Sequence, residues 1–272
     1  MEDDKHDKDR RGIQSIEVGG QLLLALAHQG RAMALKDLAR AAGMAPAKAH
    51  PYLVSFGKLG LIEQDRLSGH YGLGPLALQL GLISLQQADP VRVATPLIAD
   101  LAQQIGHSVA IAVWGTRGPT VVRLEESPTP VHVNMRHGTV VSVTDTASGR
   151  LFAAYLPTDK VRAVLDEERR REAWERERAG AVAPVASALP TWEAFAPQLD
   201  EVRAHRMSRS EGAVIEGISA MSAPVFDHTG AMVLAVTAIG PSGTFDTRWE
   251  GPIAQALRQC AGAIGRRLGG SA

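Results

Sequence analysis

The sequence has almost no cysteine and no long apolar segment. Its one cysteine, Cys260, cannot form an internal disulfide. Asp, Arg, Gln or Gly interrupts every aliphatic stretch before it reaches the roughly 20 residues that cross a bilayer. The first residues, MEDDKHDKDRRG, lack the apolar core of a signal peptide. These absences argue against a secreted, disulfide-stabilised domain and against a membrane protein. They predict a cytoplasmic protein in which residues 1–11 form a disordered tail.

The sequence also lacks a charge excess and the motifs of common catalytic and metal sites. Its 29 Lys and Arg residues are balanced by 29 Asp and Glu residues, so the whole-chain charge gives no support for nucleic-acid binding. There is no GxSxG, HExxH or CxxC motif, and the nine histidines never pair at metal-ligand spacing. We therefore expect no catalytic site, no bound metal and no cofactor, and we do not expect an enzyme.

The N-terminal part has the element order of a winged helix-turn-helix domain. Apolar side chains at helical spacing, each series followed by a glycine, predict helices at residues 13–27, 35–42 and 45–59. Two short strand patterns follow at residues 61–64 and 71–73, and Ser68 and Gly69 supply turn chemistry between them. We expect residues 12–75 to form this domain.

The remainder of the chain predicts linker helices and a second, α+β domain. Helical patterns at residues 76–87 and 90–105 predict a linker over 76–106, with Asp89 as an N-cap. Beyond it, strand patterns and helical patterns cluster separately, which is typical of an α+β sandwich over residues 107–268. The expected strands are 109–114, 120–125, 131–135, 219–227 and 231–240, and the expected helices are 148–155, 158–178, 191–205 and 252–268.

Four segments together resemble the IclR family of bacterial transcriptional regulators. They are LKDLARAAGMAPAKAHPYLVSFGKLGLIEQ, YGLGPLALQLG, TDTASGRLFAAYLP and ISAMSAPVFDHTGAMVLAVTAIGP. The resemblance covers the chain from Ile13 to Leu268 and implies a winged helix-turn-helix joined by linker helices to a GAF-like effector-binding domain. It also implies a dimer or tetramer that binds operator DNA and responds to a metabolite, often an aromatic or short carboxylic acid from a catabolic pathway.

Within the predicted recognition helix, small and polar side chains alternate with apolar ones that have core-facing spacing. Tyr52, Leu53, Phe56 and Leu59 are expected to face the core. We expect Lys48 to be the main phosphate or base contact, with Lys36, Arg40 and Lys58 as backbone anchors. The other expected DNA-facing residues are Ala45, Ala47, His50 and Ser55 in the groove and Arg66 and His70 on the wing.

Pro51 departs from the family pattern, which commonly has a long basic or polar residue at this position. Proline in a helix interior removes a backbone donor and costs about 3 kcal/mol. Either the helix begins so late that Pro51 lies near its first turn, or the helix is kinked and its groove contact is altered. Residues 12–75 contain six Lys or Arg and four Asp or Glu, so the basic excess is slight.

The resemblance also implies the positions of an effector pocket with few polar groups. It transfers the pocket to Ala147, Ser148, Ser210, Ala220, Thr237 and Ile239, with Val133 and Met135 as an apolar wall and Trp114 as a weaker candidate. Arg123, Arg136 and Arg150 could each pair with a ligand carboxylate, although a surface salt bridge is the favoured interpretation for any one of them.

The predicted function is control of a catabolic operon in response to a small aromatic or carboxylic acid. Two alternatives stay open at this point. One is a dimeric DNA-binding protein whose C-terminal domain binds no ligand. The other is an enzyme built on the C-terminal domain, which would need a nucleophile or metal that the sequence does not offer.

Overall fold

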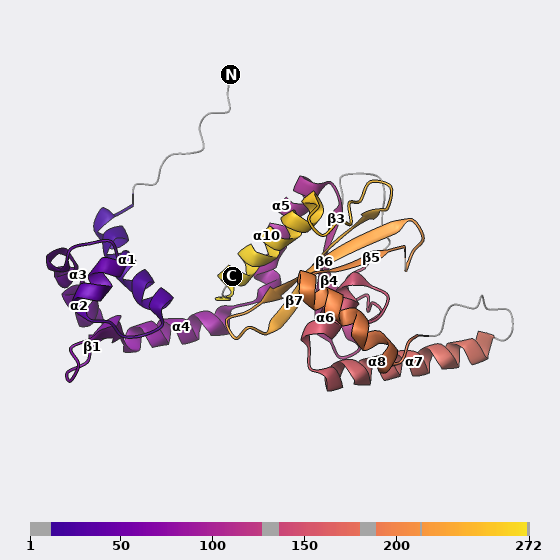
Figure 1. Cartoon of the computed structure of the whole chain (residues 1–272), viewed down its shortest axis with the longest axis horizontal. Coiled ribbons are helices and arrows are strands. Elements are labelled where there is room, and N and C mark those ends of the chain that lie inside the picture. Colours follow the sequence, from indigo (N-terminus) through magenta and orange to yellow (C-terminus); the bar gives the residue numbers. More distant parts are fainter. Residues whose placement is uncertain (1–11, 127–135, 180–188, 213, 271–272) are drawn as a thin grey trace, which may run out of the picture. The chain divides into compact units, whose positions relative to one another are not determined.

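The computed structural model describes residues 12–126, 136–179, 189–212 and 214–270. Contacts divide the chain into two compact units, Met1–Ala88 and Asp89–Ala272. In Figure 1 the first unit consists of helices and a short hairpin, whereas the second contains a β-sheet with helices packed on it. Within the described ranges, no helix has both the length and the apolar content that a membrane span requires.

The first unit packs three helices together and adds a two-stranded hairpin. Its elements are α1 (Gln14–Gln29), α2 (Leu35–Ala41), α3 (Pro46–Leu59), β1 (Ile62–Gln64), β2 (Tyr71–Leu73) and α4 (Pro75–Gln87). The apolar stripes of the first three helices meet in one core, where Leu22, Leu38 and Leu53 are almost fully buried. Gly30 and Gly60 end α1 and α3 in the left-handed conformation, which glycine adopts without strain. The predicted winged helix-turn-helix is confirmed.

Helix α4 is rich in leucine, yet it has no buried residue. Five of its large apolar side chains are between 41% and 65% exposed: Leu78, Leu80, Leu82, Ile83 and Leu85. Full burial of each such side chain is worth roughly 1.5–3 kcal/mol. Its apolar surface is therefore left without a partner among the described residues of the chain.

The second unit is built on a five-stranded antiparallel sheet of order β4-β3-β7-β6-β5. The strands are β3 (Ser108–Gly115), β4 (Gly118–Glu125), β5 (Ser208–Glu211), β6 (Ile218–Phe226) and β7 (Met232–Pro241). The helical elements are α5 (Pro90–Ile105), α6 (Ala147–Tyr155), α7 (Thr158–Ala179), α8 (Trp192–Phe195), the 3-10 helix η2 (Ala196–Gln198), α9 (Leu199–His205) and α10 (Pro252–Arg267).

The two faces of this sheet carry separate cores, because successive side chains of a strand point to opposite faces. Val236 and Ala238 of β7 pack with α5 and α10, which lie side by side in Figure 1. Ala235, on the opposite face, packs in a second core with Phe152 of α6 and Leu199 of α9. Helices cover both faces, which confirms the predicted α/β sandwich.

Three elements differ from the sequence-based expectation. The single helix expected at 191–205 is divided into α8, η2 and α9, because Pro197 has no N–H to donate and interrupts the α-helical ladder. Strand β5 was not predicted. Helix α5, expected in the linker, buries Ile98 and Leu101 in the core of the second unit. The strand expected at 131–135 lies outside the described residues.

Candidate functional site

Helix α3 turns one side to the core of the first unit and leaves the other exposed. Ala49 and Leu53 are buried. Gly19 of α1 allows a close approach between the helices, because a Cβ at this position would lie 2.8 Å from the Tyr52 ring. Leu59 is 61% exposed, so its predicted place in the core is wrong. Leu59 is the last residue of α3, so its side chain lies at the end of the helix and not over the core.

The side chains predicted to contact DNA are all exposed. They are Lys36, Arg40, Ala45, Ala47, Lys48, His50, Ser55, Lys58, Arg66 and His70. Arg40 forms an ion pair with Asp37 at 3.2 Å, and both side chains are more than half exposed. An exposed pair of this kind contributes little free energy, so it leaves Arg40 available to a stronger anion. Contact of these ten side chains with DNA stays a prediction.

Pro51 lies in the interior of α3, because the helix begins at Pro46. The interpretation that a late helix start brings Pro51 into the first turn is therefore wrong. Without an N–H on Pro51, the carbonyl oxygen of Ala47 loses its usual partner four residues on. The Ser55 hydroxyl donates to the Pro51 carbonyl at 3.0 Å, which ties one predicted groove-facing side chain to the helix itself.

The wing has a turn that its own side chains hold in place. Asp65 Oδ1 accepts hydrogen bonds from the Ser68 N–H at 2.6 Å and the Ser68 hydroxyl at 2.7 Å. These bonds, the one from the Ser68 backbone foremost, lower the pKa of the Asp65 carboxyl. Gly69 has a φ of 70°, and the Gln64 side chain donates to its carbonyl at 2.9 Å. The turn presents Arg66 and His70 on an ordered loop.

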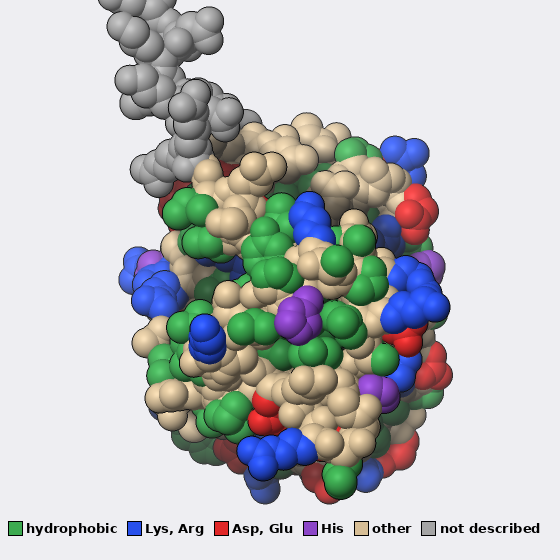
Figure 2. Space-filling model, turned by 90° about the vertical axis from the view of Figure 1, so that its left-hand side faces the viewer, with side chains coloured by type: hydrophobic (Ala, Val, Ile, Leu, Met, Phe, Trp, Pro, Cys, Tyr) green, Lys and Arg blue, Asp and Glu red, His purple; other side chains and the backbone are tan. Residues whose placement is uncertain are grey.

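The first unit carries little net positive charge. On the face drawn in Figure 2, Lys and Arg side chains lie among apolar and uncharged ones and form no single large patch. This agrees with the slight basic excess of residues 12–75.

A cavity of about 100 Å³ lies in the second unit, where the start of α6 faces the sheet. Its walls are predominantly apolar. The described residues that line it are Ala110, Val121, Val141, Thr146, Ala147, Ser148, Ser210, Val214, Ile215, Ile218, Ala220, Thr237 and Ile239. None of these side chains is charged. All polar side-chain atoms in this wall are hydroxyls, so their hydrogen bonds determine what the cavity offers to a ligand.

Three buried hydroxyls form a chain that ends at the cavity. Thr237 Oγ1 lies 2.8 Å from Ser222 Oγ and 2.9 Å from Ser148 Oγ. Ser222 is fully buried and lines no cavity, so its hydrogen has Thr237 as its acceptor among the described residues. If Ser222 donates to Thr237 and Thr237 donates to Ser148, the Ser148 hydrogen is left free at the cavity wall. Thr237 also lines the cavity, so in either direction of donation a hydroxyl of this chain faces it.

The start of α6 adds backbone donors beside Ser148. Thr146 caps the helix by accepting the Gly149 N–H at 2.9 Å, while the N–H groups of Ala147 and Ser148 have no acceptor within the helix. Gly149 is required here, because a Cβ would lie 2.1 Å from the Ser142 carbonyl oxygen. Ser210 donates its hydroxyl hydrogen to the Asp145 carbonyl at 3.0 Å, so it faces the cavity as an acceptor.

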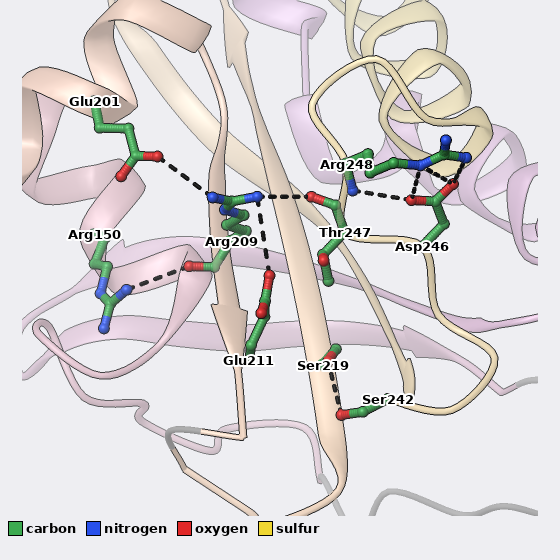
Figure 3. Close-up of polar contacts among 9 residues, drawn as sticks. All are labelled: Arg150, Glu201, Arg209, Glu211, Ser219, Ser242, Asp246, Thr247 and Arg248. Carbon is green, nitrogen blue, oxygen red and sulfur yellow. Dashed lines mark hydrogen bonds and ion pairs between the residues drawn. The ribbon is translucent and has the colours of Figure 1, made fainter.

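Arg150 lies outside the cavity and donates to two backbone carbonyls, of which Figure 3 shows that of Arg209. Its Nε donates to the Thr144 carbonyl at 2.6 Å, and Nη1 donates to the Arg209 carbonyl at 3.3 Å. Burial lowers the pKa of the guanidinium, and the charges of Asp145 and Glu201 oppose that shift. Arg150 thus holds the segment before α6 against β5, and it lines no part of the cavity.

The structure brings six predicted pocket residues together around this cavity: Ala147, Ser148, Ser210, Ala220, Thr237 and Ile239. Val133 and Met135 lie outside the described residues. Trp114 packs against Phe152 at a ring distance of 5.8 Å and does not line the cavity. Arg123 and Arg136 are exposed, and neither forms an ion pair within the described part of the chain.

Sequence reasoning missed further lining residues. Ala110, Val121 and Ile218 lie on strands, and the period-two alternation would have placed Ile218 on the same face as Ala220. Val141, Val214 and Ile215 lie outside regular elements and have no periodic signal. Ser222, which orients the hydroxyl chain, shares its strand face with Ala220 and could have been found in the same way.

Two family models match consecutive parts of the chain. The model of the IclR helix-turn-helix domain matches residues 15–66. The model of the bacterial transcriptional regulator IclR C-terminal domain matches residues 83–266.

Relatives match over almost the full length. The Glycerol operon regulatory protein of Streptomyces coelicolor is 30% identical over 95% of this chain and 98% of its own length. The crystal structure of Pseudomonas aeruginosa HmgR superimposes with a TM-score of 0.82 at 32% identity, covering 95% of this chain and 99% of that one. An IclR homolog from Microbacterium hydrocarbonoxydans, solved as a complex with 4-hydroxybenzoate, shares the fold at a TM-score of 0.52 and 18% identity, covering 93% and 98% of the two chains.

Proposed function

The chain belongs to the IclR family of bacterial transcriptional regulators, and from this premise we propose that it controls a catabolic operon in response to a small aromatic or carboxylic acid. In this proposal the first unit binds operator DNA in the cytoplasm and the cavity of the second unit binds the acid. The second unit has no catalytic role. The observation that carries the proposal is that the start of α6, with the Ser148 hydroxyl and the first-turn N–H groups, lines the cavity.

The polarity of the cavity favours an anionic end on the ligand. The Ser148 hydroxyl and the first-turn N–H groups of Ala147 and Ser148 are donors beside one another, and the helix N-terminus carries partial positive charge. A carboxylate accepts several such bonds at once. Ser210 offers an acceptor to a hydroxyl elsewhere on the same ligand.

The size of the cavity limits the ligand. An apolar cavity of about 150 Å³ holds benzene, and this one measures about 100 Å³. The ligand is thus a short acid or an acid with a single ring, for which Val214 and Ile215 would have to give way slightly. Most of its surface would contact apolar side chains, which supplies affinity, whereas the hydroxyls and N–H groups supply orientation.

We also propose a homodimer, or a tetramer built from dimers. Helix α4 carries five large apolar side chains that are at least 41% exposed. Packing this helix against its copy would bury them symmetrically, as a two-fold interface requires. Two recognition helices would then read two half-sites of a palindromic operator.

Two measurements on the purified protein test this function. Selection from a random double-stranded DNA pool should enrich one palindromic sequence. A thermal-shift panel of aromatic and short carboxylic acids, with 4-hydroxybenzoate among the probes, should include at least one acid that raises the unfolding temperature and changes affinity for the enriched DNA. Failure to enrich any sequence would overturn the proposal.

The main alternative is a DNA-binding dimer that senses no ligand. It predicts an enriched DNA sequence together with a thermal-shift panel in which no acid stabilises the protein. The cavity argues against it, because a purely structural core would fill the space that Ser148, Thr237 and the start of α6 line.

A further inference from the structure

We propose a second ligand site in the same unit, a groove of about 380 Å³ that binds a small polyanion. The groove lies where the end of α9, strand β6 and helix α10 meet, and it shares no lining residue with the cavity at α6. Three of its lining residues are arginines, Arg206, Arg258 and Arg266, and no Asp or Glu lines it. Its charge and its volume both differ from those of the cavity at α6.

The floor of the groove is made of small residues, and this gives it depth. Ala223 and Pro224 of β6 lie opposite Ala261, Gly262 and Gly265 of α10. Strand β5 pairs with β6 only from Ser219 to Ser222, so within the described residues no strand covers Ala223–Phe226 on that side. The groove is therefore the open edge of the sheet.

Two of the arginines reach this floor from opposite sides. A Cβ on Gly262 would lie 3.4 Å from Arg266 Nη1, so the Arg266 side chain folds back over α10. The Arg206 guanidinium lies over the Phe226 ring, 5.6 Å from its centre. Neither arginine has a carboxylate partner among the described residues. Arg258 is neutralised by Glu250 at 3.2 and 3.3 Å, which leaves an excess of positive charge.

The backbone at Arg206 gives independent support. Arg206 has a φ of 50° and a ψ of 32°. Every other described residue with a positive φ is a glycine. Glycine is the usual residue at such a helix end, and a long side chain there carries strain. Strain of this kind clusters at functional sites, where the side chain compensates for it. Here that side chain is a guanidinium at the rim of the groove.

The arginines indicate the class of ligand. Guanidinium groups bind phosphate and carboxylate through paired N–H donors, and Arg206 and Arg266, which have no carboxylate partner among the described residues, can each take one anionic group. Phe226 and Pro224 offer an apolar surface to the carbon skeleton between those groups. The ligand is thus a small organic molecule with two or more anionic groups, either phosphates or carboxylates.

Calorimetric titration of the full-length protein with inorganic pyrophosphate and, separately, with citrate tests this site at constant ionic strength. Pyrophosphate represents phosphate ligands and citrate represents carboxylate ligands. The variants are Arg206→Gly and Arg266→Gln, each of which should weaken binding of the preferred probe at least tenfold. Arg267→Gln is the matched control, since Arg267 is the exposed neighbour on α10 that does not line the groove.

Arg206→Gly has a second readout. Glycine adopts the left-handed conformation without strain, so the unfolding temperature should not fall below that of the wild type, even as anion binding is lost. Binding of either probe that depends on both arginines and not on Arg267 supports the site. If neither probe binds, or if all three variants bind alike, the groove is not a ligand site.

Discussion

The DNA-facing side of α3 and the cavity at α6 are built on opposite physical principles. The DNA-facing side of α3 is exposed and carries its chemistry on side chains that point into solvent. The cavity at α6 carries its polar groups in the interior, where Ser148, Ser222 and Thr237 are each less than a tenth exposed. A site of the first kind depends on charge and backbone shape, whereas a site of the second kind depends on volume and on complete hydrogen bonding.

This difference leads to different sensitivities. Binding at α3 should weaken as salt rises, because phosphate contacts release counterions. Binding in the cavity should change little with salt and much with the size of a single side chain, because the described walls carry no charge. A substitution at one site whose effect follows the sensitivity of the other site would contradict this difference.

The largest expected effect is that of Ala220→Phe. Ala220 lies on β6 and lines the cavity, and a phenyl ring would fill most of about 100 Å³. Calorimetric titration with the acid found by screening should show no binding to this variant. Ala163→Phe, which adds the same volume at an exposed position on α7, should bind like the wild type. Normal binding by Ala220→Phe would place the ligand elsewhere.

The next effect concerns Pro51. Pro51→Gln restores the missing N–H in α3 and should raise the free energy of unfolding by up to about 3 kcal/mol. Pro51→Arg restores the same N–H and also introduces a positive charge, so it should raise operator affinity as well. That increase in affinity should be smaller at high salt. Chemical denaturation and DNA titration check the two parts. Unchanged stability in both variants would show that Pro51 costs α3 nothing.

Lys48→Ala should have a smaller effect, a loss of about 1.5–3 kcal/mol in operator binding, the range for a hydrogen bond to a charged group. The slope of log affinity against log salt should fall by about 0.9, since one phosphate contact is lost. Fluorescence anisotropy at several salt concentrations measures both. Lys160→Ala removes an exposed lysine from α7 and serves as the control. Equal slopes of log affinity against log salt in the two variants would show that Lys48 makes no phosphate contact.

The smallest effect is expected for Ser148→Ala. The change removes one hydroxyl donor and leaves the N–H groups of α6 in place, so acid affinity should fall by about 0.5–1.5 kcal/mol, a few-fold to about tenfold. Thr237→Val should weaken binding to a similar degree, because the Ser148 hydroxyl loses its hydrogen-bond partner and the cavity loses a hydroxyl. If Thr237→Val has no effect while Ser148→Ala does, the contribution proposed for Thr237 is wrong.

The sequence predicted well those features that repeat along the chain. Apart from Leu59, the stripe that includes Leu53 placed one side of α3 toward the core, and the predicted DNA-facing positions are exposed as expected. Strand β5 was missed because SRSE has no apolar alternation; it forms because Ser208 and Ser210 pair with Ser222 and Ala220 across the sheet. That pairing is a tertiary property with no local signal.

The cavity could be located from the sequence only through family resemblance. Ser148 and Thr237 are 89 residues apart and meet at 2.9 Å, a contact that no local pattern indicates. No local pattern indicates the contacts of Arg150 either, and its sequence context favoured the interpretation of a surface salt bridge. Arg150 is half-buried and donates to two backbone carbonyls instead, because the loop before α6 and β5 converge on it. Such polar contacts depend on the assembled sheet.

The most direct test combines both sites in one titration. Affinity for the selected operator is measured at fixed salt with increasing acid, for the wild type and for Ala220→Phe. We expect both proteins to bind DNA equally without the acid, and only the wild type to change its affinity as acid is added. A response to the acid in Ala220→Phe equal to that of the wild type would contradict this expectation.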